Sequence, residues 1–128
     1  MASPGKRRPI QEAFPQRGEI YLTALDPALE HEIKKTRPAL VIQNDITNRF
    51  APTTIVAAIT SRVNAPPYPN EVVVHLAGVG LENISTVRLD QIRTVDRQRL
   101  IRRLGKVNSE TMRRINTAIK VSLGLIEL

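Results

Sequence analysis

Apolar and polar residues alternate over short stretches of this chain, and turn-forming residues separate the stretches. In residues 19–25 the side chains of Ile20, Leu22 and Ala24 alternate with their neighbours, and the pair Asp26-Pro27 ends this run. A period of two places successive side chains on opposite faces of a strand. Residues 84–95 alternate in the same way, and residues 38–43 are rich in β-favouring side chains. All three segments are therefore predicted as strands, with Pro38 at the first position of its strand, where no ladder N–H is needed.

Two further strands are predicted in the middle of the chain. Residues 53–60 are apolar at both odd and even positions, which is typical of a strand buried on both faces. A proline-rich loop over residues 65–69 separates this segment from a valine-rich strand over residues 71–76, and a turn is expected at Gly78–Gly80.

Helical periodicity appears only near the end of the chain. Apolar residues recur there at a spacing of about 3.6, at Met112, Ile115, Ile119 and Leu123. Ser109 is the expected N-cap of this helix, and Gly124 is the expected stop. Asp96 is expected to cap a shorter, arginine-rich helical turn over residues 97–104.

These elements predict one mainly β domain. Five or six short strands followed by a helix indicate a small, strongly curved β-barrel with helices packed on it, and 128 residues are about one ordinary domain. Residues 1–16 contain three prolines and a basic run, so they are predicted as a flexible basic tail before a domain spanning 17–128. Residues 28–36 are polar and charged, and are expected to form a long loop.

The last apolar side chains have two interpretations. They either form a surface for a partner subunit or pack within one protomer; they are Leu123, Leu125, Ile126 and Leu128.

Charge and composition narrow the function. The formal net charge of +7 favours a polyanionic partner, either nucleic acid, an acidic protein or a membrane surface. There is no cysteine and there are only two histidines, so we expect no disulfide, no thiolate nucleophile and no metal site. Apolar runs are too short for a signal peptide or a membrane span, which favours the cytoplasm. With four aromatic residues in all, RNA would be held mainly by charge and hydrogen bonds.

The candidate chemistry lies at strand ends. Arg37 stands just before Pro38, Thr60 closes the most buried predicted strand with Ser61 after it, and Arg88 and Asp90 share a strand face. Cleavage of RNA through its own 2′-hydroxyl requires an acceptor for that proton, a cation for the charge on phosphorus and a donor for the leaving oxygen. Arginine suits the charge best.

For the other roles, Asp90 or His31, which lies in the charged loop, could act as the base. Thr60 could donate a hydrogen bond to a phosphate oxygen, and no metal is required. Each of these residues also has an ordinary explanation as a solvated charge or a strand residue.

Five segments in a fixed order resemble the MazF/PemK (Kid) family of toxin endoribonucleases. They are GEIYLTALDP, TRPALVIQND, NRFAPTTIVAAITS, DQIRTVDRQRL and VSLGLIEL, and the resemblance runs from Arg17 to the last residue. The resemblance implies an SH3-like β-barrel with helices, of the MazF/CcdB type, and a homodimer.

The same resemblance implies a function. Members of this family cut single-stranded RNA, such as mRNA, within short sequences without a metal or other cofactor, leave 2′,3′-cyclic phosphate and 5′-hydroxyl ends, and so inhibit translation. A MazE-like antitoxin with an acidic C-terminal segment neutralises them, and a toxin–antitoxin hetero-oligomer on operator DNA is a further possible assembly.

The resemblance also assigns roles to residues. Arg37 matches the central catalytic arginine and Thr60, beside Ser61, the catalytic threonine, while His31 and the Arg88–Asp90 pair match further residues of Kid-like members. The residues expected along the RNA path are Glu32, Lys34, Asn44, Tyr68 and Gln91.

Two alternatives remain. One is a CcdB-like poison of DNA gyrase, and the other is a basic barrel that binds RNA without cutting it. CcdB-like chains lack the arginine of the T-R-P motif and end in Trp-Gly-Ile, whereas this chain has Arg37, no tryptophan and a Leu-Ile-Glu-Leu end. The sequence therefore favours the ribonuclease.

Overall fold

A computed structural model describes residues 14–76 and 84–127 of the chain. Strands hold about twice as many of these residues as helices do, in agreement with the predicted fold class. The strands are β1 (Glu19–Ala24), β2 (Thr36–Val41), β3 (Thr53–Thr60), β4 (Glu71–His75), β5 (Ile84–Asp96) and β6 (Leu100–Lys106), and the helices are α2 (Asp45–Phe50), the 3-10 turn η2 (Arg97–Arg99) and α3 (Ser109–Ser122). The turn expected at Gly78–Gly80, residue Leu128 and most of the expected N-terminal tail lie outside the described residues.

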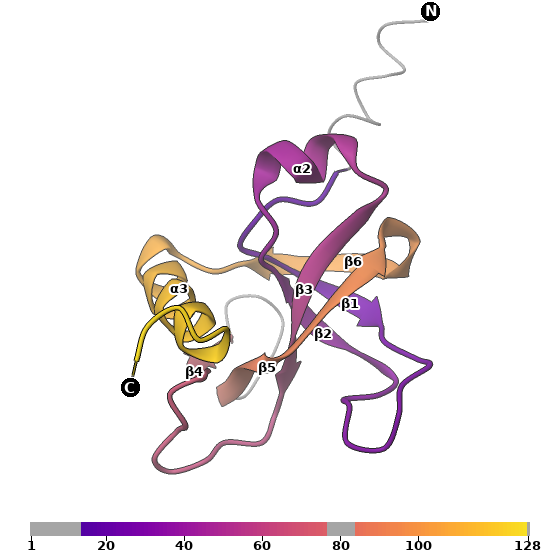
Figure 1. Ribbon diagram of the computed structural model, residues 1–128. Coiled ribbons are helices and arrows are strands. Elements are labelled where there is room, and N and C mark those ends of the chain that lie inside the picture. Colours follow the sequence, from indigo (N-terminus) through magenta and orange to yellow (C-terminus); the bar gives the residue numbers. More distant parts are fainter. Residues whose placement is uncertain (1–13, 77–83, 128) are drawn as a thin grey trace, which may run out of the picture.

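The strands form one antiparallel sheet in the order β4-β5-β3-β2-β1-β6. It is strongly twisted, with α3 against one side and α2 near one end (Figure 1). In the described part of the chain the edge strands β4 and β6 do not pair with each other, so the sheet curves without closing into the expected barrel.

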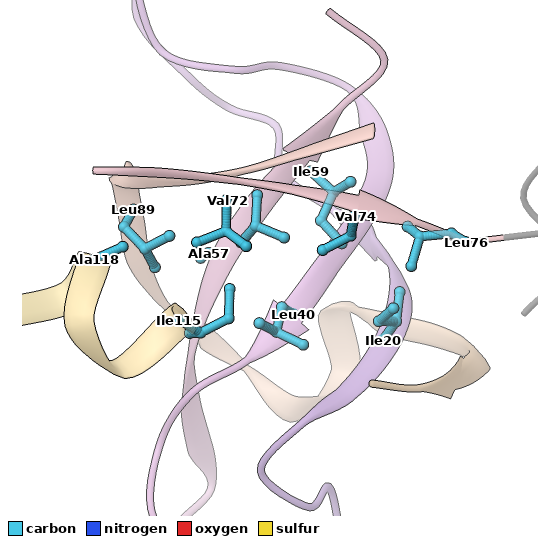
Figure 2. Packing of buried hydrophobic residues seen from close by; sticks show 11 residues of the cluster. Ile20, Leu40, Ala57, Ile59, Val72, Val74, Leu76, Leu89, Ile115 and Ala118 are labelled. Carbon is cyan, nitrogen blue, oxygen red and sulfur yellow. The ribbon is translucent and has the colours of Figure 1, made fainter. Parts of the chain in front are cut away.

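Both faces of the sheet are buried. One face packs against α3 through a cluster that includes Leu40, Ala57, Ile59, Ile115 and Ala118 (Figure 2). The opposite face buries a second cluster, formed by Leu25, Ala39, Val41, Val56, Ala58 and Val95. Because side chains alternate along a strand, β3 supplies residues to both clusters. This confirms the prediction of a strand buried on both faces.

A bulge interrupts β5 opposite the middle of β3. Ala57 pairs with Ile92, but the next residue, Ala58, pairs with Arg88, so residues 89–91 face no residue of β3. The backbone at Leu89 is held instead by its neighbours, since its N–H donates to Asn70 O at 3.0 Å and its carbonyl accepts from Ser122 Oγ at 2.6 Å. A bulge bends a strand and redirects its side chains.

The arginine-rich helical turn predicted over residues 97–104 is wrong. Asp96 caps only the 3-10 turn Arg97–Arg99, by accepting from the Gln98 N–H at 2.9 Å. The chain then continues as β6, which pairs with β1. Backbone hydrogen bonds to a distant strand outweigh the local helical preference here.

The C-terminal helix is confirmed, with a different cap. The N-cap is Asn108, whose side chain accepts from the Thr111 N–H at 2.8 Å, and Ser109 is the first helical residue. Gly124 ends the helical region with a φ of +74°, a conformation that glycine adopts at little cost.

Strand β2 begins earlier than predicted. Pro38 is its third residue and lies opposite Leu22 of β1. Pairing of β2 with β3 starts only at Ala39, so the proline stands before that ladder begins and removes no hydrogen bond from it.

Helix α2 was not predicted. Asn44 caps it by accepting from the Thr47 N–H at 2.8 Å, and Asn48 anchors it through hydrogen bonds with Gln43 and Thr54 in the interior. Six residues are too few to show a helical period.

Candidate active site

The candidate site lies where β2 begins and β3 ends. Ala39 pairs with Ala58, and Arg37 and Thr60 each lie two residues from this pair, at the adjoining ends of the two strands. Arg88 of β5 is also a partner of Ala58. Residues two apart on a strand and directly paired residues share a face. Three adjacent strands therefore place Arg37, Thr60 and Arg88 on one face of the sheet.

A pocket of about 420 Å³ contains these three side chains. Its remaining lining residues are Glu30, His31, Glu32, Ile33, Lys34, Lys35 and Arg62. Five of the lining side chains are cationic and two are acidic, so the pocket suits an anion. A phosphodiester has the charge and the acceptor oxygens that such a pocket would bind.

The loop over residues 25–35, predicted as a loop from 28 onward, forms one wall of the pocket. Arg93 of β5 donates to the carbonyl oxygens of Leu25 and Ile33, at 2.7 and 3.2 Å. The Ile33 N–H donates to Gln91 Oε1 at 3.2 Å. Since these bonds hold both ends of the loop to β5, the loop tip between them stays exposed beside the pocket.

Arg37 presents free donors. Its side chain is partly buried, and its Nε donates to the Lys34 carbonyl at 3.2 Å. Neither Nη nitrogen has a hydrogen-bond acceptor among the described residues. A guanidinium fixed at Nε and open at both Nη groups is suited to grip two oxygens of a phosphate.

Thr60 is the second donor of the site. Its Oγ1 accepts from the Arg62 N–H at 3.2 Å, which leaves the hydroxyl hydrogen available to donate. Ser61 follows it and is exposed. The sequence-predicted pair of Arg37 and Thr60 is thus brought together by the sheet, with Ser61 at its edge.

Arg88 is engaged by carboxylates. It donates to Asp90 from Nε at 2.8 Å and from Nη2 at 2.6 Å, and its Nε lies 3.6 Å from Glu71 Oε2. The hydrogen bonds from Arg88 hold the pKa of Asp90 below its ordinary range, and the same bonds raise the pKa of Arg88. A carboxylate whose pKa is lowered is a weaker proton acceptor, so Asp90 is the less suitable of the two predicted bases.

His31 lies at the rim of the pocket. Its side chain is 99% exposed, and Nε2 is 3.9 Å from Glu30 Oε2. A second pocket of about 500 Å³ shares His31 and its two glutamate neighbours and adds Leu29 and Gln91. The tip of the loop therefore separates two adjoining hollows.

The residues expected along the RNA path are only partly brought together. Glu32 and Lys34 line the first pocket, and Gln91 lines the second. Tyr68 is exposed in the loop before β4 and lines neither pocket. Asn44 also lies outside both pockets, because its side chain caps α2.

Sequence reasoning missed Glu71 of β4. Its side chain is 3% exposed and accepts three hydrogen bonds from the preceding loop. Nothing in the sequence distinguishes it from an ordinary exposed acid at a strand start. Lys35 and Arg62, which also line the site, were missed for the same reason.

In the described ranges, no three His, Asp or Glu side chains gather in a way that could hold a metal ion. None of the helices in these ranges is long and apolar enough to cross a membrane.

Comparison with known proteins supplies the family context for this geometry. A family model described as "PemK-like, MazF-like toxin of type II toxin-antitoxin system" matches residues 16–123. Endoribonuclease EndoA of Bacillus subtilis is 42% identical over 112 residues, which cover 88% of this chain and 97% of that protein. Endoribonuclease MazF of Staphylococcus saprophyticus is 41% identical over 110 residues, covering 86% and 92%.

Solved structures show the same fold. MazF from Deinococcus radiodurans superposes with a TM-score of 0.74 at 26% identity, covering 87% of this chain and 97% of that one. A mycobacterial endoribonuclease, solved in complex with its cognate antitoxin, gives a TM-score of 0.73 at 27% identity, covering 89% and 99%.

Proposed function

This chain belongs to the family of PemK-like, MazF-like toxins of type II toxin–antitoxin systems, and from that premise we propose that it cuts single-stranded RNA in the pocket between β2, β3 and β5. The match over residues 16–123 confirms the predicted family. Two relatives named endoribonucleases, each above 40% identity over most of the chain, confirm the predicted class of enzyme.

The juxtaposition of Arg37 and Thr60 carries the proposal. The open Nη groups of Arg37 and the hydroxyl of Thr60 project from facing strands into one cationic pocket. A scissile phosphate between them accepts hydrogen bonds on its non-bridging oxygens. These bonds strengthen as negative charge builds up on the five-coordinate phosphorus, and this difference lowers the barrier.

The reaction is an internal transesterification. The 2′-oxygen attacks phosphorus, the bond to the 5′-oxygen breaks, and the ends are a 2′,3′-cyclic phosphate and a 5′-hydroxyl. We assign acceptance of the 2′-proton to His31, which is exposed at the pocket rim, whereas Asp90 is held by Arg88. Arg37 transfers a proton to the strongly basic leaving oxygen and regains one from water, while His31 releases to water the proton that it accepted. These steps use no metal.

Recognition of RNA sequence falls to the exposed loops around the pocket. Glu32, Lys34 and Gln91 line the two hollows beside the phosphate site, and Tyr68 offers an exposed ring in the neighbouring loop. Unstacked bases are recognised by such side chains. Cutting mRNA at short sequences would inhibit translation.

The proposed partner is an antitoxin. A structurally similar mycobacterial endoribonuclease was solved with its cognate antitoxin. An acidic C-terminal segment of a MazE-like antitoxin would neutralise this chain by covering its cationic pocket. We place the toxin in the cytoplasm as a homodimer, and a hetero-oligomer with antitoxin on operator DNA stays a prediction.

The test is cleavage of a long RNA by the purified protein in the presence of EDTA. The wild type gives discrete fragments with the stated ends, and Arg37→Ala reduces the rate by about 100-fold or more, since one preorganised donor has that effect in other enzymes. Arg102→Ala, which removes an exposed arginine of β6, serves as the control and retains full activity.

Other outcomes would favour the other functions. Intact RNA with a shifted band would indicate a barrel that binds without cutting. Inhibited supercoiling by gyrase, with RNA untouched, would indicate a CcdB-like poison.

A further inference from the structure

Glu71 ties the loop over residues 61–70 to the start of β4. Asn64 Nδ2 donates to both carboxylate oxygens of Glu71, at 3.1 and 3.0 Å, and the Tyr68 N–H donates to Oε1 at 3.0 Å. The Tyr68 carbonyl accepts in turn from the Glu71 N–H at 2.9 Å. The carboxylate therefore holds the loop at two points.

The same carboxylate also faces the candidate active site. Its Oε2 lies 3.6 Å from Nε of Arg88, and the two residues are direct partners across β4 and β5. Arg88 is thus flanked by two carboxylates, Glu71 on the adjacent strand and Asp90 on its own. With Nε and Nη2 committed to them, Nη1 is the nitrogen with no acceptor among the described residues.

Burial makes these contacts consequential. The Glu71 side chain is 3% exposed, and a carboxylate removed from water is costly unless donors and a cation compensate it. Asn64, Tyr68 and Arg88 supply that compensation. The Glu71 carboxylate in turn restricts the positions of Asn64, Tyr68 and Arg88.

The loop reaches the pocket as well. Arg62, near its start, lines the pocket together with Arg88, while Tyr68 is exposed on the same loop. A displacement of the loop relative to Arg88 would change which base fits beside the phosphate site.

We propose that Glu71 is a positioning residue that, together with Asp90, sets the orientation of Arg88 and also fixes the placement of the 61–70 loop, and that it thereby determines which RNA sequence is cut. The proposal rests on the proposed ribonuclease function. Glu71 does not touch the reacting atoms, and it acts through Arg88 and the loop.

Glu71→Gln tests this role, because it preserves size while removing the charge and one of the two acceptor oxygens. We expect kcat/KM on the preferred RNA to fall by about 10- to 100-fold, because small displacements of catalytic groups lower rates by such factors. We also expect the mapped fragment ends to show a relaxed base preference. The exposed Glu110→Gln in the first turn of α3 changes the net charge equally and leaves both unchanged.

Two further variants separate the routes of action. Asn64→Leu breaks the loop contact without touching Arg88, so it relaxes base preference more than it lowers kcat. Arg88→Gln lowers kcat, and adding Glu71→Gln to it lowers kcat little further, because the two act on the same guanidinium. A Glu71→Gln enzyme that cuts the same sites at the wild-type rate would overturn the inference.

Hydrogen exchange gives a readout that needs no RNA. Glu71→Gln speeds exchange at the Tyr68 N–H and the Arg88 Nε–H, relative to the wild type and to Glu110→Gln. Unchanged exchange at both groups would overturn the positioning role. Failure of the wild type to cut RNA, with exchange as expected, would overturn the proposed function alone.

Discussion

Arg88 and Asp90 lie two residues apart on β5, and their side chains meet through two parallel hydrogen bonds of 2.8 and 2.6 Å. Residues 89–91 face no residue of β3, so Asp90 belongs to the bulge rather than to the regular ladder. The pair therefore fixes the guanidinium on the pocket face while leaving the carboxylate close to solvent.

The Arg88–Asp90 pair makes the free energy of unfolding depend on pH in the acid range. The pKa of Asp90 in the folded chain is below its ordinary value of about 3.9. The ion pair therefore stabilises the fold above about pH 4, and this contribution is lost as pH falls through the lowered pKa. Asp90→Asn should remove that part of the acid dependence. Urea unfolding of both proteins from pH 2 to pH 7 measures it, and parallel curves would contradict the assignment.

The hydroxyl of Thr60 is expected to matter for cleavage and not for folding. Thr60→Val keeps the branched shape at the end of β3 and removes the donor, so the cleavage rate should fall by about 10- to 100-fold while the unfolding temperature barely changes. Thr60→Ser restores the hydroxyl and most of the rate. Initial rates on one RNA decide the matter, and a fully active valine variant would remove Thr60 from the site.

Tyr21 of β1 gives a second dependence on pH, at the alkaline end. Burial, together with the neighbouring Glu19 carboxylate, raises its pKa to about 12. A raised pKa stabilises the fold below the ordinary value of about 10, and the contribution is lost as pH rises from there through the raised value. Tyr21→Phe should show a shallower loss of stability between pH 9 and pH 12. Denaturant unfolding over that range measures it, and equal slopes for the two proteins would refute it.

The end of the chain offers a test of the predicted homodimer. Leu123, Leu125 and Ile126 are all exposed after α3, with Leu125 69% exposed. If these side chains form a surface between subunits, Leu125→Glu should convert the dimer to a monomer without unfolding it. Sedimentation of the two proteins provides the measurement. A variant that sediments as the wild type does would place the interface elsewhere.

Local patterns predicted most of the sheet. Strand β3 has the predicted bounds, Thr53–Thr60, because a short, uninterrupted apolar run is typical of a strand that is buried on both faces. Strand β6 was mistaken for a helix, since its arginines and leucines favour a helix locally and its pairing with β1 is a long-range effect. The juxtaposition of Arg37 and Thr60 also depends on strand register, which a single segment does not encode.

The positions that sequence reasoning missed depend on contacts between distant segments. Glu71 acquires its surroundings from Asn64, in the preceding loop, and from Arg88, across the sheet. Asn44, expected near RNA, instead caps a helix too short to be recognised. The tertiary structure decides which hydrogen-bond partners a polar side chain meets, and a short sequence motif does not reveal those partners.

In the bulge of β5, the residues whose side chains lie beside the pocket are not the residues that pair the strand with β3. Residues 89–91 have no pairing partner in β3. Substitutions at Asp90 and Gln91 therefore leave the β3–β5 ladder intact on either side of the bulge. During evolution, the side chains at these two positions can therefore change one at a time, and with them the chemistry of the pocket, while the sheet keeps its structure.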